Sequence, residues 1–466
     1  MSRVTKFRVL PRFTKRTLIV GTEGGSNCSI FLGKLAEELC ETDVWFDIDK
    51  EHVISIVGKR GSGKSYTLGC FAESLATTSE QILKGKITRS SLLFDTINIF
   101  WTMAYVPGNQ TQKDIAKQKQ LLEEWKLSSA DVKVDIWIPA GFEMPETTFK
   151  TFKLGIPDLE ASDWCYLLGY DMFRDLGGQL ILETVDKVRL SGWTWVERDA
   201  NDNILEEKAV PARNEYSIDD LIKCTEHDKE ITSKTEGYAV QSRRAVINNM
   251  RVFSRYPLFS IKGTPLKDMF TPGRLTVLLL GSVPSDVRAA IVSVFVKNLL
   301  KLRSETSYYE KALLVQAGNE KKLKEAIQKG IPRVTLLIDE AQNLLPSTMK
   351  TMFNEVMVKL VREGRNFGIS VIMTTQQPTA IDSRVMAQVD TIISHKLVAI
   401  SDLQYITQNL KSKDPSEITY KGDGLTSEEL IRDLPVGYAY VSSTEAERSF
   451  ILLVRPRVTV HGGFEL

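Results

Sequence analysis

Eight residues from Gly58 to Ser65 have the types and spacing needed to hold a phosphate chain. They read Gly-Lys-Arg-Gly-Ser-Gly-Lys-Ser and match the pattern G-x-x-x-x-G-K-[S/T] in full. The three glycines permit backbone turns that point successive N–H groups at phosphate oxygens. The alternative is a glycine-rich turn that binds nothing. The residues expected around a nucleotide are Gly58, Arg60, Gly61, Ser62, Gly63, Lys64, Ser65 and Tyr66.

Two adjacent acids, Asp339 and Glu340, follow the apolar run Val334–Ile338. Carboxylates at the end of a buried strand cost desolvation energy unless cations or hydrogen bonds compensate. Asp339, with the Ser65 hydroxyl, suits a Mg²⁺ site, and Glu340 suits the base that polarises an attacking water. Lys64 would neutralise the phosphate oxygens. The alternative is an ordinary solvated strand end.

The next apolar run, Ile369–Met373, ends in the polar residues Thr374, Thr375 and Gln376. This order predicts a strand between the phosphate-loop strand and the acid-bearing strand, with Gln376 sensing the terminal phosphate. A simple turn amide is the alternative. Arg365 follows a predicted amphipathic helix over 348–361, where arginine is often structural. Its place between Glu340 and Gln376 favours a guanidinium that reaches a neighbouring subunit's nucleotide.

The elements that must position these residues read as strand–helix units on a parallel sheet. We therefore expect an α/β fold with a doubly wound, mainly parallel core. A short β region that forms a reduced barrel-like platform is expected over 1–50, and the core over 51–100 and 265–436. An inserted, mainly helical subdomain is expected over 101–264, and a β edge with an arm over 437–466. The expected core strands are His52–Val57, Ser91–Phe94, Leu275–Leu280, Val334–Ile338 and Ile369–Met373.

The long middle segment must hold structure of its own, because it is far too long for a loop. Its patterns predict a strand, a helix, a β-hairpin that turns at Asp199–Asn203, and a basic helix. In chain order these are Val132–Ile138, Trp164–Arg189, Gly192–Leu205 and Ala239–Arg255. The expected antiparallel C-terminal strands are Gly437–Ser442, Ser449–Val454 and Arg457–Val460.

Composition limits the class of protein. The chain has 466 residues, with 60 Lys+Arg against 59 Asp+Glu and a net charge of +1, so it is not a binder that coats nucleic acid by bulk charge. Its five cysteines include no C-x-x-C pair. There is no secretory leader and no run of about 18 apolar residues, so a cytoplasmic protein is expected.

Taken together, these motifs resemble the HerA branch of the HerA/FtsK ATPases. The runs that carry the resemblance are GKRGSGKSYTLG, LLIDEAQNLLP, REGRNFGISVIMTTQQPTAIDSRVMAQVDT and VRPRVTVHGG. The resemblance implies a RecA-like core, ATP and Mg²⁺, and a homohexameric ring whose ATP sites lie between subunits. It also implies DNA in the central pore and a partner nuclease or other effector.

By the same resemblance, several residues take roles. Lys64 and Ser65 match the Walker A residues, and Asp339 and Glu340 match the Walker B pair. Gln376 matches the sensor, and Arg365 matches an arginine finger that acts in trans. Asp95 matches an acid of the second strand, and Arg455–Arg457 with His461 match an arm that leans on the adjoining subunit. The chain departs from the family in three ways: a short segment before the phosphate loop, no Gly-Glu-Tyr turn after Asp95, and Gln377 where arginine is frequent.

Two functions of different class follow. The first is a DNA translocase or helicase motor acting with an effector, in antiviral defence or in DNA end processing. The second is a nucleotide-switched ring scaffold that activates an effector. A motor of a conjugation or secretion system is less favoured. For DNA, two basic clusters could line a pore, although a solvated helix face is the better default for each. The clusters are Arg243, Arg244, Arg251 and Arg255, and Lys113, Lys117 and Lys119.

Overall fold

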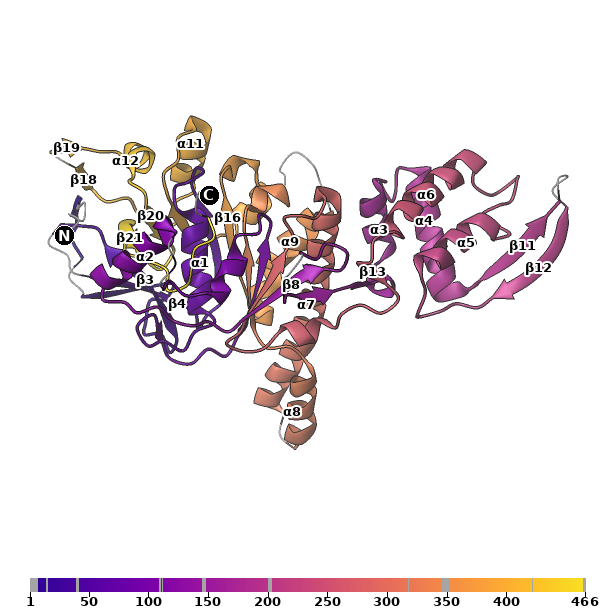
Figure 1. The fold of residues 1–466 in the computed structure, drawn as a ribbon, viewed down its shortest axis with the longest axis horizontal. Coiled ribbons are helices and arrows are strands. Elements are labelled where there is room, and N and C mark those ends of the chain that lie inside the picture. Colours follow the sequence, from indigo (N-terminus) through magenta and orange to yellow (C-terminus); the bar gives the residue numbers. More distant parts are fainter. Residues whose placement is uncertain are drawn as a thin grey trace.

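One large sheet organises the chain (Figure 1). The computed structural model describes residues 7–463 apart from 14–15, 39–41, 109, 111, 145–147, 200–202, 317, 346–351 and 421. In the described residues the sheet has 14 strands in the order β2-β4-β3-β21-β20-β17-β5-β16-β15-β7-β14-β8-β9, with β6 (Leu83–Lys84) pairing with β3.

The centre of this sheet is parallel and buried. Its strands are β17 (Thr391–Ser394), β5 (Val53–Val57), β16 (Ile369–Thr375), β15 (Val334–Ile338), β7 (Ser90–Asp95), β14 (Leu275–Leu279) and β8 (Val134–Pro139). Near-continuous apolar runs form such strands because helices cover both faces. The five core strands expected from sequence are confirmed, as is the doubly wound α/β class.

Helices lie on both faces of the parallel strands. On one face α1 (Lys64–Ser74) packs its Leu68 and Phe71 into a core that also contains Leu337 of β15. On the other face, Leu336 and Ile338 join a core with α7 (Ser285–Val315) and α9 (Met352–Glu363). Successive strand residues alternate between the two cores, as the period of two requires.

Strand β16 lies between β5 and β15, as the motif order predicts. Thr375 is in register with Val57, and Ile338 with both Met373 and Phe94. The carboxyl ends of β5, β16, β15 and β7 therefore meet at one edge. This edge receives the residues that the sequence marks for chemistry.

The N-terminal strands differ from expectation. β2 (Thr17–Val20), β4 (Asp43–Asp47) and β3 (Ser29–Leu35) do not make a barrel-like platform over 1–50 but extend the main sheet. The reason is that β3 is paired on both edges, to β4 on one side and to the C-terminal strand β21 (Phe450–Val454) on the other. The short strand β1 (Arg8–Leu10) instead pairs with β18 (Glu417–Tyr420), which also pairs with β19 (Asp423–Gly424).

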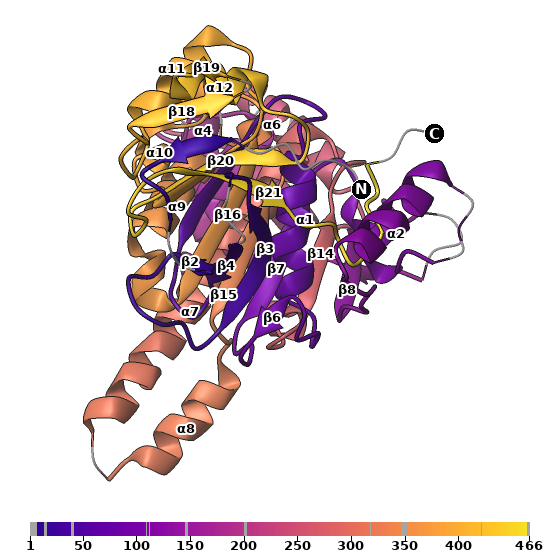
Figure 2. The same ribbon diagram turned by 90° about the vertical axis from the view of Figure 1, so that its left-hand side faces the viewer.

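The C-terminal hairpin of β20 (Tyr438–Ser443) and β21 is as expected, but the expected strand Arg457–Val460 does not form. Its backbone N–H groups donate to side chains and not to a neighbouring strand. Arg457 N donates to the Tyr66 hydroxyl, and Val458 N and Thr459 N donate to the Glu73 carboxylate. We call residues 455–463 the C-terminal arm. Figure 2 shows β20, β21 and α1 side by side.

The middle segment contains both core and insertion. β8 and β9 (Lys150–Phe152) join the main sheet, so the expectation that all of 101–264 lies outside the core is wrong for them. β8 is apolar enough to be buried against β14. The helix α2 (Lys113–Glu124) also precedes the insertion. Its residue Gln118 donates to the backbone oxygens of Arg457 and Thr459, so α2 packs on the C-terminal arm.

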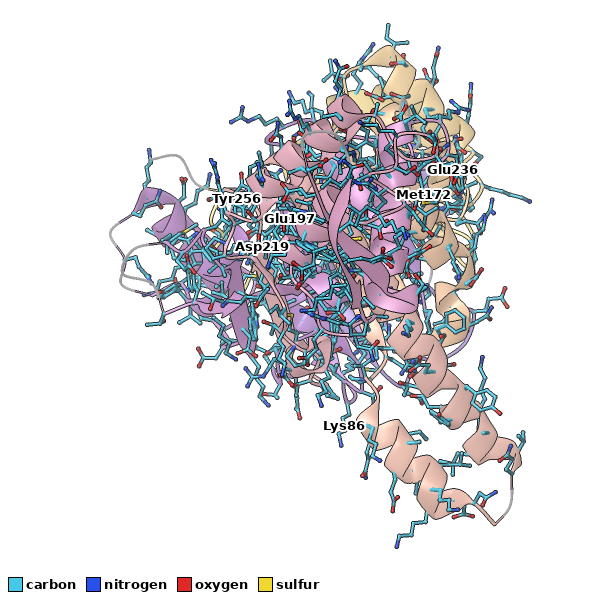
Figure 3. The ribbon with its side chains drawn as sticks, turned by 90° about the vertical axis from the view of Figure 1, so that its right-hand side faces the viewer. Lys86, Met172, Glu197, Asp219, Glu236 and Tyr256 are labelled. Carbon is cyan, nitrogen blue, oxygen red and sulfur yellow. The ribbon has the colours of Figure 1, made fainter. Side chains whose placement is uncertain are left out.

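The helical insertion proper, residues 161–253, lies at one end of the molecule in Figure 1, and this end faces the viewer in Figure 3. The single helix expected over Trp164–Arg189 is two helices, since Gly169 adopts φ 76° and ends the first. The hairpin and the basic helix are confirmed; residues 200–202 of the turn lie outside the described residues. The elements are α3 (Ala161–Leu168), α4 (Leu176–Asp186), β11 (Trp193–Arg198), β12 (Ile204–Val210), α5 (Ile218–His227) and α6 (Val240–Phe253).

The remaining elements lie around the core. α7 overruns the sheet and turns into α8 (Glu320–Lys329), and this pair projects from the body in Figures 1 and 2. A small parallel pair of strands, β10 (Leu154–Gly155) and β13 (Phe259–Ser260), lies between the core and the insertion. Three short helices follow β16, namely α10 (Ser383–Met386), α11 (Ile400–Gln408) and α12 (Ser427–Asp433). Among the described residues, no helix combines the length and apolarity of a membrane span.

Candidate active site

The phosphate loop takes the form that its sequence predicts. β5 ends at Val57, α1 begins at Lys64, and Gly58, Gly61 and Gly63 between them have φ values of 155°, 74° and 113°. A Cβ added to Gly58 would lie 2.5 Å from Ser62 Oγ. Glycine is therefore required by both conformation and space. The loop opens at a helix N-terminus, where backbone N–H groups favour anions. Arg60 is exposed on it.

Lys64 lies buried between the loop and the acids of β15. Its Nζ donates to Lys59 O at 3.2 Å and lies 4.0 Å from Glu340 Oε1. Burial lowers the pKa of Lys64, and the charges of Glu340 and Asp339 oppose that effect. An incoming phosphate would supply the compensating negative charge that such a buried ammonium requires.

Asp339 and Ser65 provide the donor set for a divalent cation. Ser65 Oγ donates to Asp339 Oδ1 at 3.0 Å, and Thr374 Oγ1 donates to the same oxygen at 2.7 Å. Oδ2 of Asp339 is buried and has no hydrogen-bond partner in the described part of the chain. A hard cation takes such oxygen ligands, so these residues fit Mg²⁺.

A second buried acid lies beside this site. Asp95, at the end of β7, is held by the backbone N–H groups of Ile97 and Phe100 at 3.2 and 2.7 Å. Burial raises the pKa of Asp95 to about 7, with a contribution from the nearby charge of Asp339. Burial likewise raises the pKa of Asp339 to about 6, although its bonds to Thr374 and Ser65 oppose the shift. Two such acids at one edge are poised to accept a cation.

Glu340 is held in a strained backbone conformation, with φ 52°, by a bond of 2.9 Å from its N–H to Thr374 Oγ1. Its carboxylate accepts hydrogen bonds from Gln376 Nε2 at 2.7 Å and from Gln342 Nε2 at 2.6 Å. Gln376 thus lies where the sequence predicts. Gln342 was missed, and its only signal is its position two residues after Glu340.

His395 is a second residue that sequence reasoning missed. It follows β17 and is fully buried under the phosphate loop, with Nε2 2.8 Å from Thr67 Oγ1 and Nδ1 2.8 Å from Tyr438 O. Burial, with the Lys64 charge, lowers the pKa of His395 to about 4. The neutral ring therefore joins the loop's helix to β20. Nothing in the local sequence marks this long-range contact.

Tyr66 and the C-terminal arm differ from expectation. The Tyr66 hydroxyl accepts a 2.7 Å bond from Arg457 N, and its ring meets His461 edge to face, so its polar atom faces the arm. Arg455 and Arg457 are fully buried and pair with Glu73 of α1. The resemblance implied an arm leaning on an adjoining subunit, but these arginines lean on the chain's own phosphate-loop helix.

Arg365 lies apart from the other predicted residues. It precedes β16, whereas Gln376 follows β16, so the two residues stand at opposite edges of the sheet. Its guanidinium pairs with Asp390, which also accepts a 2.8 Å bond from Val53 N. Within one chain the structure brings together Lys64, Ser65, Asp339, Glu340 and Gln376, but not Arg365.

Comparison with known proteins agrees with this geometry. A family model described as "Helicase HerA-like C-terminal" matches residues 290–459. The DNA double-strand break repair helicase HerA of Sulfurisphaera tokodaii is 29% identical over 169 residues, which are 36% of this chain and 31% of that protein. The protein of the same name from Sulfolobus acidocaldarius is 25% identical over 208 residues, 44% of this chain and 35% of that protein.

Residues 290–459 are therefore similar to the C-terminal part of HerA-like helicases. The matches span about a third of the length of these curated relatives. VirB4 of Thermoanaerobacter pseudethanolicus shares the fold, with a TM-score of 0.51 at 14% identity over 92% of this chain and 96% of that one. The family model begins after the phosphate loop, so the role of Gly58–Ser65 in this HerA-like chain rests on the loop's own geometry.

Proposed function

We propose that this HerA-like chain is an ATP-hydrolysing motor that translocates along or unwinds DNA, as a homohexamer acting with a partner nuclease or other effector in antiviral defence or DNA end processing. One observation carries the proposal. Lys64, Ser65, Asp339 and Glu340 come from two elements far apart in sequence, and they converge at one edge of the sheet with Gln376.

Each of these residues has a separate role in the proposed ATP hydrolysis. The loop N–H groups and Lys64 hold the β- and γ-phosphates, and Ser65 with Asp339 holds the cation. When bound, Mg²⁺ would offset charge on the phosphate oxygens. Glu340 takes a proton from water as the water oxygen bonds to the γ-phosphorus and the bond to the bridging oxygen breaks, so that ADP leaves with the electron pair.

Arg365 is proposed to act on a neighbour. Its side chain is about half exposed at the sheet edge opposite its own phosphate loop. It therefore serves no phosphate in its own chain. A guanidinium offered to a nucleotide in the next subunit would make each site depend on ring assembly.

DNA is proposed as the track because the relatives are named DNA repair helicases. Basic side chains are available on two exposed helix faces. Arg244 and Arg255 are exposed on and after α6, and Lys113 and Lys117 are exposed on α2. Arg251 shares the α6 face but is paired with Glu226. A ring multiplies such contacts sixfold, so a neutral chain can still bind a polyanion.

The test measures phosphate release by the purified chain, alone and with single- or double-stranded DNA, together with strand displacement and the mass of the assembly. We expect turnover that DNA stimulates, a hexamer, and loss of turnover in Lys64→Ala and Glu340→Gln. Glu207→Gln, an exposed residue of β12, is the matched control. Turnover that is indifferent to DNA would contradict the motor and favour a nucleotide-switched scaffold.

A further inference from the structure

Gln342 lies in the short 3-10 turn Ala341–Asn343, two residues beyond Glu340. Its Nε2 donates to Glu340 Oε2, while Gln376 Nε2 donates to Oε1 from the neighbouring strand. Two neutral amides, one from the turn after β15 and one just beyond the end of β16, thus hold the two oxygens of one carboxylate. This arrangement fixes the carboxylate plane without neutralising its charge.

The other end of the Gln342 amide is unusual. Its Oε1 is buried and accepts no hydrogen bond from the residues that the structure describes. Rotating the amide would not relieve this, because Oε1 would then face the Glu340 carboxylate and two acceptors would oppose each other. Buried acceptors are nearly always satisfied, so this oxygen points to a donor that arrives with the substrate.

We propose that Gln342 is a further catalytic residue, which orients the Glu340 carboxylate through Nε2 and accepts a hydrogen bond from the attacking water through Oε1. The inference rests on the proposed ATP hydrolysis. Water has two O–H groups: one donates to Glu340, which takes that proton, and the other donates to Gln342. Each carboxylate oxygen has a second lone pair, so the water need not displace either amide.

With both O–H groups engaged, a lone pair of the water is directed at the γ-phosphorus. The new O–P bond then forms as the bond to the bridging oxygen breaks, and ADP takes the electron pair. Fixing the water in this orientation removes rotational freedom before the reaction begins. Gln376 differs because it reaches Oε1 from β16, on the side where Lys64 lies 4.0 Å away.

The test compares Gln342→Leu with Asn343→Ala, an exposed neighbour in the same turn that serves as control. Turnover, ATP affinity and the thermal midpoint are measured on the full chain. Proton transfer to a positioned base contributes about 10²–10⁴-fold, and Gln342 positions both that base and the water, so we expect turnover in Gln342→Leu to fall by about 100-fold or more. ATP affinity should stay within about twofold, because this contact forms with water and not with the nucleotide.

Two further variants separate chemistry from folding. Glu340→Gln with Gln342→Leu should be no slower than Glu340→Gln alone, since both side chains act on the same water. Gln342→Glu places a second carboxylate against Glu340, so the acidic limb of the pH–rate profile should move up by about one pH unit or more. Because glutamate and glutamine have the same size, Gln342→Glu still tests the inference if Gln342→Leu lowers the thermal midpoint of unfolding.

Unchanged turnover in Gln342→Leu would overturn the inference, as would an unchanged pH profile in Gln342→Glu. Equal losses in the wild-type and Glu340→Gln backgrounds would also overturn it. A wild-type chain and an Asn343→Ala control that both bind ATP without hydrolysing it would overturn the proposed function itself, and this inference with it.

Discussion

Arg455 donates from Nη1 to Oε1 of Glu73 at 2.5 Å, and neither side chain has any exposed surface. The same Glu73 accepts from Val458 N and Thr459 N and lies 3.6 Å from the Arg457 guanidinium. One buried carboxylate thereby ties the C-terminal arm to the helix that begins at the phosphate loop.

Glu73→Gln should destabilise the fold strongly. It leaves two buried guanidinium groups without a counter-charge, and breaking a buried pair in this way costs about 3–5 kcal/mol. Urea unfolding measures the loss, with the exposed Glu80→Gln as control. A change within about 0.5 kcal/mol, the size expected of a surface substitution, would show that the arm is not a structural tie.

Asp339→Asn should separate nucleotide binding from metal binding. The asparagine Oδ1 can still accept from Thr374 and Ser65, but the ligand charge is lost. We expect affinity for ATP with Mg²⁺ to fall by at least the roughly 10–100-fold that losing a supporting metal contact costs. Affinity for ATP in a chelator should barely change. Calorimetric titration under both conditions measures this, and equal losses in the two would contradict a metal role.

The raised pKa values of Asp95 and Asp339 should make the nucleotide-free protein less stable as pH rises. The pKa of Asp95 is raised by burial to about 7, so the folded chain holds a proton that the unfolded chain releases near pH 4. Stability therefore falls between about pH 4 and pH 7 and levels off above that range. Asp339, whose pKa is raised to about 6, adds to the same trend.

The measurement is the thermal midpoint at pH 5 and pH 8. Wild type should lose stability at pH 8, whereas Asp95→Asn should show a smaller difference because its amide does not titrate. The exposed Asp219→Asn should behave as wild type. A wild-type midpoint that rises from pH 5 to pH 8 would contradict the assignment.

His395→Phe should weaken nucleotide binding without changing the pH dependence of turnover. The phenyl ring keeps the bulk beneath Gly58 and Gly63 but leaves Thr67 Oγ1 and Tyr438 O unpartnered. Each unsatisfied buried group costs about 1–3 kcal/mol. Because the pKa of His395 is lowered to about 4, its ring stays neutral from pH 6 to pH 8. Pre-steady-state nucleotide binding and pH–rate profiles test both statements.

Arg365→Ala should slow turnover by roughly 10³–10⁵-fold with little loss of ATP affinity, if its guanidinium completes a neighbour's site. Mixed rings locate the effect. Lys64→Ala subunits, which keep Arg365, are mixed with Arg365→Ala subunits, which keep Lys64. Activity should return at each site where an Arg365→Ala subunit holds the nucleotide and a Lys64→Ala neighbour supplies Arg365. No recovery at any ratio would place the role of Arg365 within its own chain, at Asp390.

The residues that the sequence located well belong to compact local patterns. Lys64 and Ser65 follow a glycine loop, and Asp339 and Glu340 end an apolar strand, so each pair is placed by a few neighbouring residues. Parallel register then aligns Gln376 with them. These steps need only the rule that carboxyl ends of parallel strands share an edge.

What the sequence could not locate depends on distant partners. Arg457–Val460 has strand-like residues, yet Glu73, almost four hundred residues earlier, takes its N–H groups. β8 reads as the first strand of an insertion because pairing with β14 leaves no local signal. Gln342 and His395 are ordinary residue types whose roles appear only when Glu340 and Thr67 are beside them.

The position of β21 has a consequence for folding during synthesis. The N-terminal strand β3 and the phosphate-loop strand β5 are close in sequence, but β21, β20 and β17 separate them in the sheet. A ribosome must therefore release residues 391–454 before β3 can reach its place beside β21. Until then the edge of β3 is paired only at Ser29 and Ile30, by β6, and the rest of that edge is open to chaperones and to misassembly. We therefore expect this late, long-range pairing to slow folding and to prolong the exposure of that edge during synthesis.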